Sequence, residues 1–278
     1  MREIEYGEIV STVSELCVQA ATKLPDDLCK LLKQARETEI SPAGRSAMED
    51  IVDNFSFAAE AELPICQDTG MAVVFCQLGQ DVHITGGLLT DAINEGVRRG
   101  YVTLRKSVVK DPLQRVNTGD NTPAVIHIEL VSGDTMRLTV APKGFGSENM
   151  SRMKMFLPSC KREDIEKFIA ETISIAGSNP CPPVVVGVGL GGTVEKAAIL
   201  AKTALARPVG ERNANPYYAE MEANTLRRIN SIGVGPQGFG GLNTAVAVNI
   251  EVYPPHIAGL PCVVNVGCHA TRHACKVI

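Results

Sequence analysis

Three cysteines in polar turns place the strongest constraint on how this chain can fold. Cys66 stands in residues 63–70, Leu-Pro-Ile-Cys-Gln-Asp-Thr-Gly, just before the apolar run 71–75. Cys181 follows Asn-Pro and precedes Pro-Pro, and Cys268 lies between Val-Gly and His. Turns of this composition hold side chains on a fixed backbone at the end of a strand, where they can point at a ligand. If the three thiols act together, the fold must gather segments that stand far apart in the sequence.

The spacing of the cysteines leaves several alternatives open. There is no C-x₂-C clip of the kind seen in small zinc modules and bacterial ferredoxins, and three scattered cysteines are more often unrelated. Their polar turns are nevertheless unusual for core residues. A local zinc site made by Cys268, His273 and Cys275 is another alternative. The remaining cysteines lie in helical or strand-like patterns and are predicted to be apolar fillers: Cys17, Cys29, Cys76, Cys160 and Cys262.

Composition excludes several classes of protein. The net charge is −4 and aromatic residues make up 4% with no Trp, so we expect no nucleic-acid partner. No apolar run approaches the roughly 20 residues of a membrane span, and the acidic N-terminus lacks the apolar centre of a signal peptide. We therefore expect a cytoplasmic or similarly reducing location and no membrane partner. The nine cysteines are then fillers or metal ligands rather than disulfides.

Periodicity predicts a single mixed α/β domain over residues 1–278, with several short sheets and a helical N-terminal segment over 1–62. Within that segment Ser41 is the expected N-cap of a helix that begins at Pro42. Helical and strand patterns then alternate. The predicted helices are 89–104, 164–176, 193–206 and 216–232. The predicted strands are 71–75, 124–131, 136–140, 184–188, 245–253 and 262–266. Ser-Gly-Asp at 132–134 predicts a hairpin.

Two glycine-rich stretches allow more than one interpretation. Gly187-x-Gly189-x-x-Gly192 follows a strand and begins a helix, as in a dinucleotide-binding fingerprint. The second strand and acidic residue that such a site needs are missing, which disfavours a nucleotide site, and the glycines could equally serve close packing or anion contact. Residues 233–241 contain five glycines, which let the backbone turn or pass close to a ligand or another chain.

Six motifs in order along the chain resemble one known family. They are residues 64–70, 117–119, 143–147, 179–183, 235–238 and 256–270. Together they resemble the α-type half of iron–sulfur hydro-lyases, the class I fumarases and L(+)-tartrate dehydratases. The resemblance covers essentially the whole chain. Because single-chain members carry a further β-type domain, this sequence is similar to the α subunit of the two-subunit form. Phe145 departs from the pattern, since a third glycine often stands there.

The resemblance implies a specific site. Three irons of a [4Fe–4S] cluster would be ligated by Cys66, Cys181 and Cys268, and the fourth iron would bind the substrate hydroxyl and a carboxylate. The positions that match the family's substrate contacts are Gln67, Asp68, Arg105, Gly146 and His256, with Asp68 also handling a proton. A separate β subunit would supply the remaining cationic contacts and a catalytic Thr, in a heterodimer or heterotetramer.

The expected reaction is reversible hydration of fumarate to (S)-malate, a step of the tricarboxylic acid cycle. Dehydrating a hydroxy diacid removes a proton beside a carboxylate and expels hydroxide, and an open iron assists as a Lewis acid. Arg105 offers a planar fork for a substrate carboxylate. L(+)-tartrate dehydratase is the alternative within the family. A nicotinamide-dependent oxidoreductase and a non-catalytic metal-stabilised scaffold are alternatives of other classes.

Overall fold

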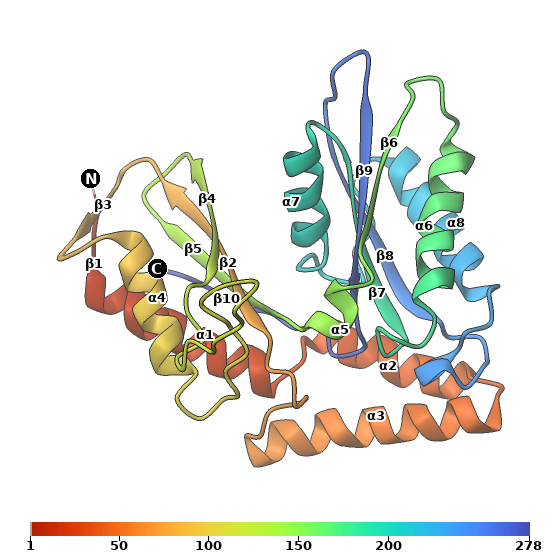
Figure 1. The fold of residues 1–278 in the computed structure, drawn as a ribbon, viewed down its shortest axis with the longest axis horizontal. Helices are drawn as coiled ribbons and strands as arrows, with labels where there is room; N and C mark the ends of the chain where they lie inside the picture. The colour runs from red at the N-terminus through yellow and green to blue at the C-terminus, as the bar shows by residue number, and fades with distance from the viewer. Residues whose placement is uncertain (1) are drawn as a thin grey trace. The chain divides into compact units, whose positions relative to one another are not determined.

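Two units, each with its own sheet and core, make up the chain in the computed structural model, which describes residues 2–278 (Figure 1). The first unit comprises the chain up to Pro25, Phe55–Gly144 and Arg272–Ile278. The second unit comprises Asp26–Asn54 and Phe145–Thr271. Both units are therefore assembled from segments that are far apart in the sequence.

The first unit is built on a four-stranded sheet in the order β10-β5-β2-β4. Its strands are β2 (Met71–Gly79), β4 (Val125–Val131), β5 (Met136–Lys143) and β10 (Ala274–Val277). One face carries α1 (Tyr6–Thr22), which packs on β5 and β10, and α4 (Leu89–Gly100) packs on α1, so that both helices share one apolar core with β2 and β5 (Figure 1). A separate parallel pair joins β1 (Arg2–Glu5) to β3 (Val82–Thr85). The turn that carries Cys66, residues 65–70, leads directly into β2 at Met71.

The predicted hairpin between the strands at 124–131 and 136–140 is wrong. The two strands exist, but β2 lies between them, parallel to β4 and antiparallel to β5. The intervening turn wraps over the end of β2, where Gly79 N–H donates to Thr135 O at 2.9 Å and Gln80 N–H to Val131 O at 2.8 Å. A side chain on Gly79 would overlap the Gly133 carbonyl. The glycines at this point therefore serve a crossing over a third strand.

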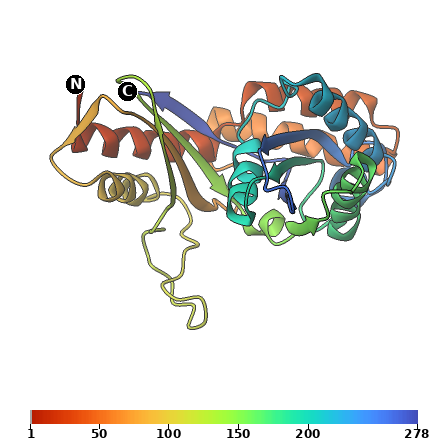
Figure 2. The ribbon, with the colours of Figure 1, turned by 90° about the horizontal axis from the view of Figure 1, so that it is seen from above.

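The second unit is a three-layer arrangement around a sheet in the order β6-β9-β7-β8. Its strands are β6 (Arg152–Phe156), β7 (Val184–Gly191), β8 (Ala245–Tyr253) and β9 (Leu260–Gly267). One face carries α7 (Val194–Ala204), and the other carries α6 (Arg162–Ala176) and α8 (Pro216–Asn230) (Figures 1 and 2). Every residue of β7 is buried, which explains its continuous apolar sequence. The short helices α5 (Phe145–Glu148) and η1 (Pro236–Gly238) flank this sheet.

The glycines of the nucleotide-like fingerprint have a packing role. Side chains on Gly187 and Gly189 would overlap the backbone carbonyls of Ala201 and Ala197, respectively, in α7. The next strand of the sheet along the chain is β8, which begins only at Ala245. The spacing of these glycines therefore follows from the close approach of a helix to the strand that precedes it.

The N-terminal helices are confirmed, and they are distributed over both units. Besides α1 they are α2 (Asp26–Thr38) and α3 (Pro42–Ala61). Ser41 is the N-cap as predicted, because its Oγ accepts from Gly44 N–H at 3.2 Å. Whereas α1 packs in the first unit, α2 packs near β8 in the second, and α3 runs from one unit into the other. Glu39, between α2 and α3, is fully buried and bonded to the Leu242–Asn243 backbone.

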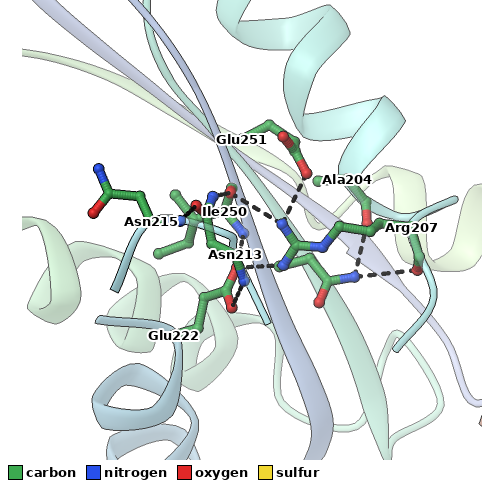
Figure 3. A network of polar contacts seen from close by, with 8 residues as sticks. Ala204, Arg207, Asn213, Asn215, Glu222, Ile250 and Glu251 are labelled. Atoms are coloured by element: carbon green, nitrogen blue, oxygen red, sulfur yellow. Dashed lines mark hydrogen bonds and ion pairs between the residues drawn. The ribbon is translucent and has the colours of Figure 1, made fainter. Parts of the chain in front are cut away.

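A buried ion-pair network fastens the α7–α8 connection to β8 in the second unit (Figure 3). Arg207 pairs with Glu222, which is fully buried, and donates to Glu251 at 2.8 Å. Glu222 also accepts the backbone N–H of Ile250 at 2.8 Å and that of Asn213 at 3.0 Å. Because the charges are paired and hydrogen-bonded, their burial is tolerated.

The predicted mixed α/β class with several short sheets is confirmed. Four short strands were not predicted, β1, β3, β6 and β10, because each spans only four or five residues without a clear alternation. The assignment of residues 1–278 to one catalytic domain stays a prediction. Among residues 2–278, no helix combines the length and apolar character needed to cross a membrane.

Candidate active site

The Cys66 turn, residues 65–70, connects α3 to β2 in the first unit. Buried Ile65 anchors its start by donating its N–H to Ala21 O at 3.0 Å. Asp68 closes an Asx turn, since its Oδ1 accepts from Gly70 N–H at 3.0 Å. Cys66 and Asp68 are half-buried and Gln67 is exposed. The turn therefore presents three of the predicted site residues side by side on a fixed backbone.

Buried polar groups hold the end of this turn and join it to Arg105. The Tyr101 hydroxyl donates to Thr69 O at 3.0 Å, and Asn121 Nδ2 donates to Gly70 O at 3.1 Å. Burial raises the pKa of Tyr101 well above its usual range, so the hydroxyl keeps its proton and stays a donor. Thr69 Oγ1 donates to Arg105 O at 2.5 Å. The Arg105 backbone is thus tied to the turn while its side chain is exposed.

Two further first-unit segments contact Asp68. The guanidinium of Arg272, a residue only 5% exposed, donates to the Asp68 carbonyl oxygen at 2.6 Å. A methyl group placed on Gly144 would lie 3.1 Å from Oδ2 of Asp68. Lys143 is buried beside it and donates to Gly144 O at 3.3 Å. In the first unit, Gln67 and Asp68 thus follow Cys66 directly, and the Arg105 backbone is bonded to the same turn.

The second unit brings Cys181 and Cys268 together on two adjoining loops. Because β7 is antiparallel to β9, the start of one strand meets the end of the other. We refer to residues 178–183 and 268–271 as the cysteine loops. The backbone N–H of His269 donates to Cys181 O at 3.3 Å, and its Nδ1 lies 3.0 Å from the same oxygen. The cysteine loops are thus joined directly by His269.

The glycine-rich stretch 233–241 supports these loops. Gln237 donates to Pro182 O through both its backbone N–H and its Nε2, each at 2.8 Å. Its Nε2 also lies 3.2 Å from His269 Nδ1. Gly238 has φ +83°, and a methyl group there would lie 2.5 Å from Ser178 Cβ. Glycine is needed here because the backbone approaches the first cysteine loop closely.

Gly146 and His256 occupy different ends of the second unit. Gly146, in α5, lies near the cysteine loops, because a methyl group there would be 3.7 Å from Asn179 O. His256 is exposed in the β8–β9 connection. The full length of β9, from Leu260 to Gly267, separates this connection from the cysteine loops, a distance of about 23 Å at the usual rise of a strand. The structure therefore does not bring His256 to the two cysteines of its own unit.

Comparison with known proteins identifies the family. The sequence model of the fumarate hydratase (Fumerase) family matches residues 10–276. The chain belongs to the fumarate hydratase family. It is 40% identical to the putative L(+)-tartrate dehydratase subunit alpha of Methanocaldococcus jannaschii over 98% of both chains. It is 34% identical to the L(+)-tartrate dehydratase subunit alpha of Escherichia coli O157:H7, over 98% of this chain and 91% of that protein.

Three of the five cysteines predicted as fillers in this fumarate hydratase family member are buried, whereas Cys29 and Cys160 are half-buried. Cys17, Cys76 and Cys262 are buried, as predicted for fillers, and desolvation raises the pKa of their thiols to about 12, 11 and 12, respectively. A metal ligand must instead be a thiolate. Cys181 is exposed, and Cys66 and Cys268 are half-buried. Members of the family generally carry an iron–sulfur cluster, and the accessible thiols fit that ligand chemistry.

Convergence of all three thiols stays a prediction. Across residues 2–278, no group of three or more His, Cys, Asp or Glu side chains is arranged to bind a metal ion. The loops that carry Cys181 and Cys268 are joined to each other in the second unit, whereas Cys66 belongs to the first unit. Cys275 lies in β10, with its Sγ 3.9 Å from Arg137 Nη1. The zinc alternative that includes Cys275 is not among the arrangements found in the described part of the chain.

Sequence reasoning missed the residues that hold the site together. Asn121, Tyr101 and Arg272 fix the Cys66 turn, and His269 and Gln237 fix the cysteine loops. The turn-rich composition around Asn121 and the motif around Gln237 marked their loops. Neither pattern indicated which carbonyl each amide would reach.

Proposed function

We propose that this chain is the α subunit of an iron–sulfur hydro-lyase that reversibly hydrates fumarate to (S)-malate. A [4Fe–4S] cluster would be held by Cys66, Cys181 and Cys268. The proposal rests on the family match over residues 10–276 and on the accessibility of these thiols in polar loops. The observation that carries it is the set of contacts that converge on Asp68 in one unit and on the cysteine loops in the other.

Two short connections link these sets of contacts. Gly144 lies against Asp68 in the first unit, and Gly146, two residues later, lies against the first cysteine loop. Arg272 donates to the Asp68 carbonyl and follows Cys268 by four residues.

Within the proposed active site, each residue has a role that its chemistry allows. The Arg105 guanidinium would bind one substrate carboxylate in a bidentate manner. The Gln67 amide and the Gly146 backbone N–H would orient the substrate. Asp68 would hold or transfer a proton at Oδ2, since Oδ1 already accepts the Gly70 N–H. When bound, the cluster supplies Lewis-acid polarisation of the leaving hydroxyl.

His256 is the predicted substrate contact with the least support, because it lies at the far end of its own sheet. Its role therefore stays a prediction from family resemblance. The other residues of the proposed site belong to the Cys66 turn, to the segment fixed to it, or to the vicinity of the cysteine loops.

L(+)-tartrate is the second candidate substrate. The specific observation in its favour is that the relatives reported above are named as L(+)-tartrate dehydratase α subunits. Tartrate, like malate, is a 2-hydroxy diacid, so the proposed roles of Arg105 and Asp68 hold for both. The subunit names also support a β subunit as partner, in a heterodimer or heterotetramer. A reducing compartment such as the cytoplasm would suit the cluster, and within residues 2–278 no cysteine forms a disulfide.

The test is anaerobic reconstitution of the full chain with its β subunit, followed by iron analysis and assay against fumarate and tartrate. We expect about four irons, the content of one [4Fe–4S] cluster. Cys66→Ser, Cys181→Ser and Cys268→Ser should each lower the iron content and abolish hydration. Two controls, Cys76→Ser in the core and exposed Cys275→Ser, should retain wild-type iron. Equal iron loss in ligand and control variants would refute the ligand assignment.

A further inference from the structure

A long irregular segment carries Arg105. Between α4 and β4, residues 101–124 form no helix and no extended strand, and this yellow-green loop extends away from its sheet (Figure 2). Its two arms are joined by the antiparallel bridge of Val109 with Asn117 and by backbone hydrogen bonds such as Lys110 N–H to Val116 O at 2.7 Å. A loop of this kind needs some other constraint if a side chain on it is to bind a substrate in one geometry.

Asn121 provides such a constraint from inside the protein. It is fully buried, and its amide uses both ends. The Oδ1 atom accepts from Ser107 N–H at 2.7 Å and from Val108 N–H at 3.3 Å. The Nδ2 atom donates to Gly70 O at 3.1 Å. One side chain therefore bridges the segment that begins with Arg105 to the turn that contains Asp68.

The bonds of Asn121 lie close in the sequence to both site residues. Ser107 is two residues beyond Arg105, and Gly70 is two residues beyond Asp68. Thr69 adds a second link by donating to Arg105 O. Asn121 itself adopts φ +63°, a conformation that asparagine tolerates better than most residues. The three hydrogen bonds of the Asn121 amide offset the strain of this backbone conformation.

We propose that Asn121 is a positioning residue that fixes Arg105 relative to Asp68, and thereby sets where a dicarboxylate binds relative to the group that handles its proton. The inference rests on the proposed function and adds to it a determinant of substrate geometry. Asn121 acts through the backbone of its neighbours and does not itself contact the substrate.

Two substitutions separate the two ends of the amide. Asn121→Asp keeps an oxygen for the Ser107 and Val108 N–H groups but turns a second oxygen toward the Gly70 carbonyl, so it releases only the Cys66 turn. Asn121→Gly suits the positive φ and removes both links. Asn94→Asp is the matched control. It keeps the acceptor for Ala124 N–H and loses a donor to Thr90 O, at the other end of the same loop.

Steady-state kinetics of the reconstituted holoenzyme with its β subunit provide the first readout, on fumarate and on tartrate. Asn121→Asp should lower kcat with little change in KM, because it disturbs Asp68 and leaves Arg105 held. Asn121→Gly should lower kcat and raise KM, with kcat/KM down by about 100-fold, the effect of a misplacement near 1 Å. Asn94→Asp should match the wild type. Unchanged kcat and KM in both Asn121 variants would overturn the proposal.

Hydrogen exchange of the full chain without iron provides a readout independent of activity. Amides of peptide 105–110 should exchange about five-fold faster in Asn121→Gly, as expected for loss of one hydrogen bond, and at the wild-type rate in Asn121→Asp. Peptide 66–70 should exchange faster in both. Wild-type exchange in both peptides would overturn the bridge itself. If the wild-type enzyme neither hydrates fumarate nor dehydrates tartrate, the proposed function fails, and the exchange rates still decide whether Asn121 holds the two segments.

Discussion

Glu39→Gln tests how the connection between α2 and α3 is held within the second unit. The Glu39 carboxylate is fully buried. It accepts six hydrogen bonds of 2.9 to 3.1 Å from five donors, namely the backbone N–H groups of Ile40, Ser41, Leu242 and Asn243 and the Asn243 side chain. A glutamine amide has one accepting oxygen, so in either orientation at least two of these donors face an NH₂ group. Each unsatisfied buried donor costs about 1–3 kcal/mol, so two of them should lower the free energy of unfolding by about 2–6 kcal/mol.

The assay is urea denaturation of the full chain without iron, followed by far-UV circular dichroism. Glu37→Gln is the matched control, because it makes the same change of charge two residues away on an exposed side chain. We expect the control to stay within about 0.5 kcal/mol of the wild type, while Glu39→Gln lowers the midpoint clearly. Equal midpoints for the two variants at pH 7 would refute the claim that this carboxylate stabilises the second unit.

The pH dependence follows from the pKa of Glu39. Burial raises this pKa, but the hydrogen bonds from Ser41, Asn243 and Leu242 together outweigh burial and leave it below its usual range. A lowered carboxyl pKa stabilises the fold at pH values above the unfolded pKa, ~4.3, and this contribution is lost as the pH falls through the folded pKa. The stability difference between wild type and Glu39→Gln should therefore shrink below about pH 4. A difference that grows on acidification would contradict this reasoning.

Two further predictions concern the second unit. Glu222→Gln should lower the free energy of unfolding by about 3–5 kcal/mol, because it removes the charge that pairs with a largely buried arginine. Exposed Glu220→Gln on the same helix is the control and should change stability little. Equal urea midpoints for the two variants would contradict the assigned role of the network in Figure 3. His269→Ala should speed removal of iron from the reconstituted protein by a chelator, because the ring contact with Cys181 O is lost. Exposed His83→Ala is its control, and identical rates of iron loss would show that the ring does not hold the cysteine loops.

Local patterns predicted most elements because their causes are local. The cap at Ser41 and the helix it begins depend on bonds between residues three or four apart. Strands β7 and β8 were recognised from continuous apolar runs. The glycines at 187 and 189 lie where α7 approaches β7 closely, the packing role that the sequence left open as an alternative.

The arrangement of these elements depended on distant partners. The hairpin prediction failed because a third strand, β2, offers β4 and β5 an apolar ladder on each side, and no local signal between those strands reveals this competitor. His256 and the cysteine loops lie at opposite ends of one sheet because β8 and β9 run in opposite directions. The predicted substrate contacts were thus separated by strand direction, which spacing in the sequence does not encode.

The sequence by itself determined the family, the helices and the longer strands, and the polar turns that carry the three predicted ligands. Only the tertiary structure decided which carbonyl the buried amide of Asn121 reaches and that His269 joins two cysteine loops. The physical reason is range. Periodicity, capping and turn chemistry act over a few residues, whereas a buried polar group must find its partner among segments that only folding brings within hydrogen-bonding distance.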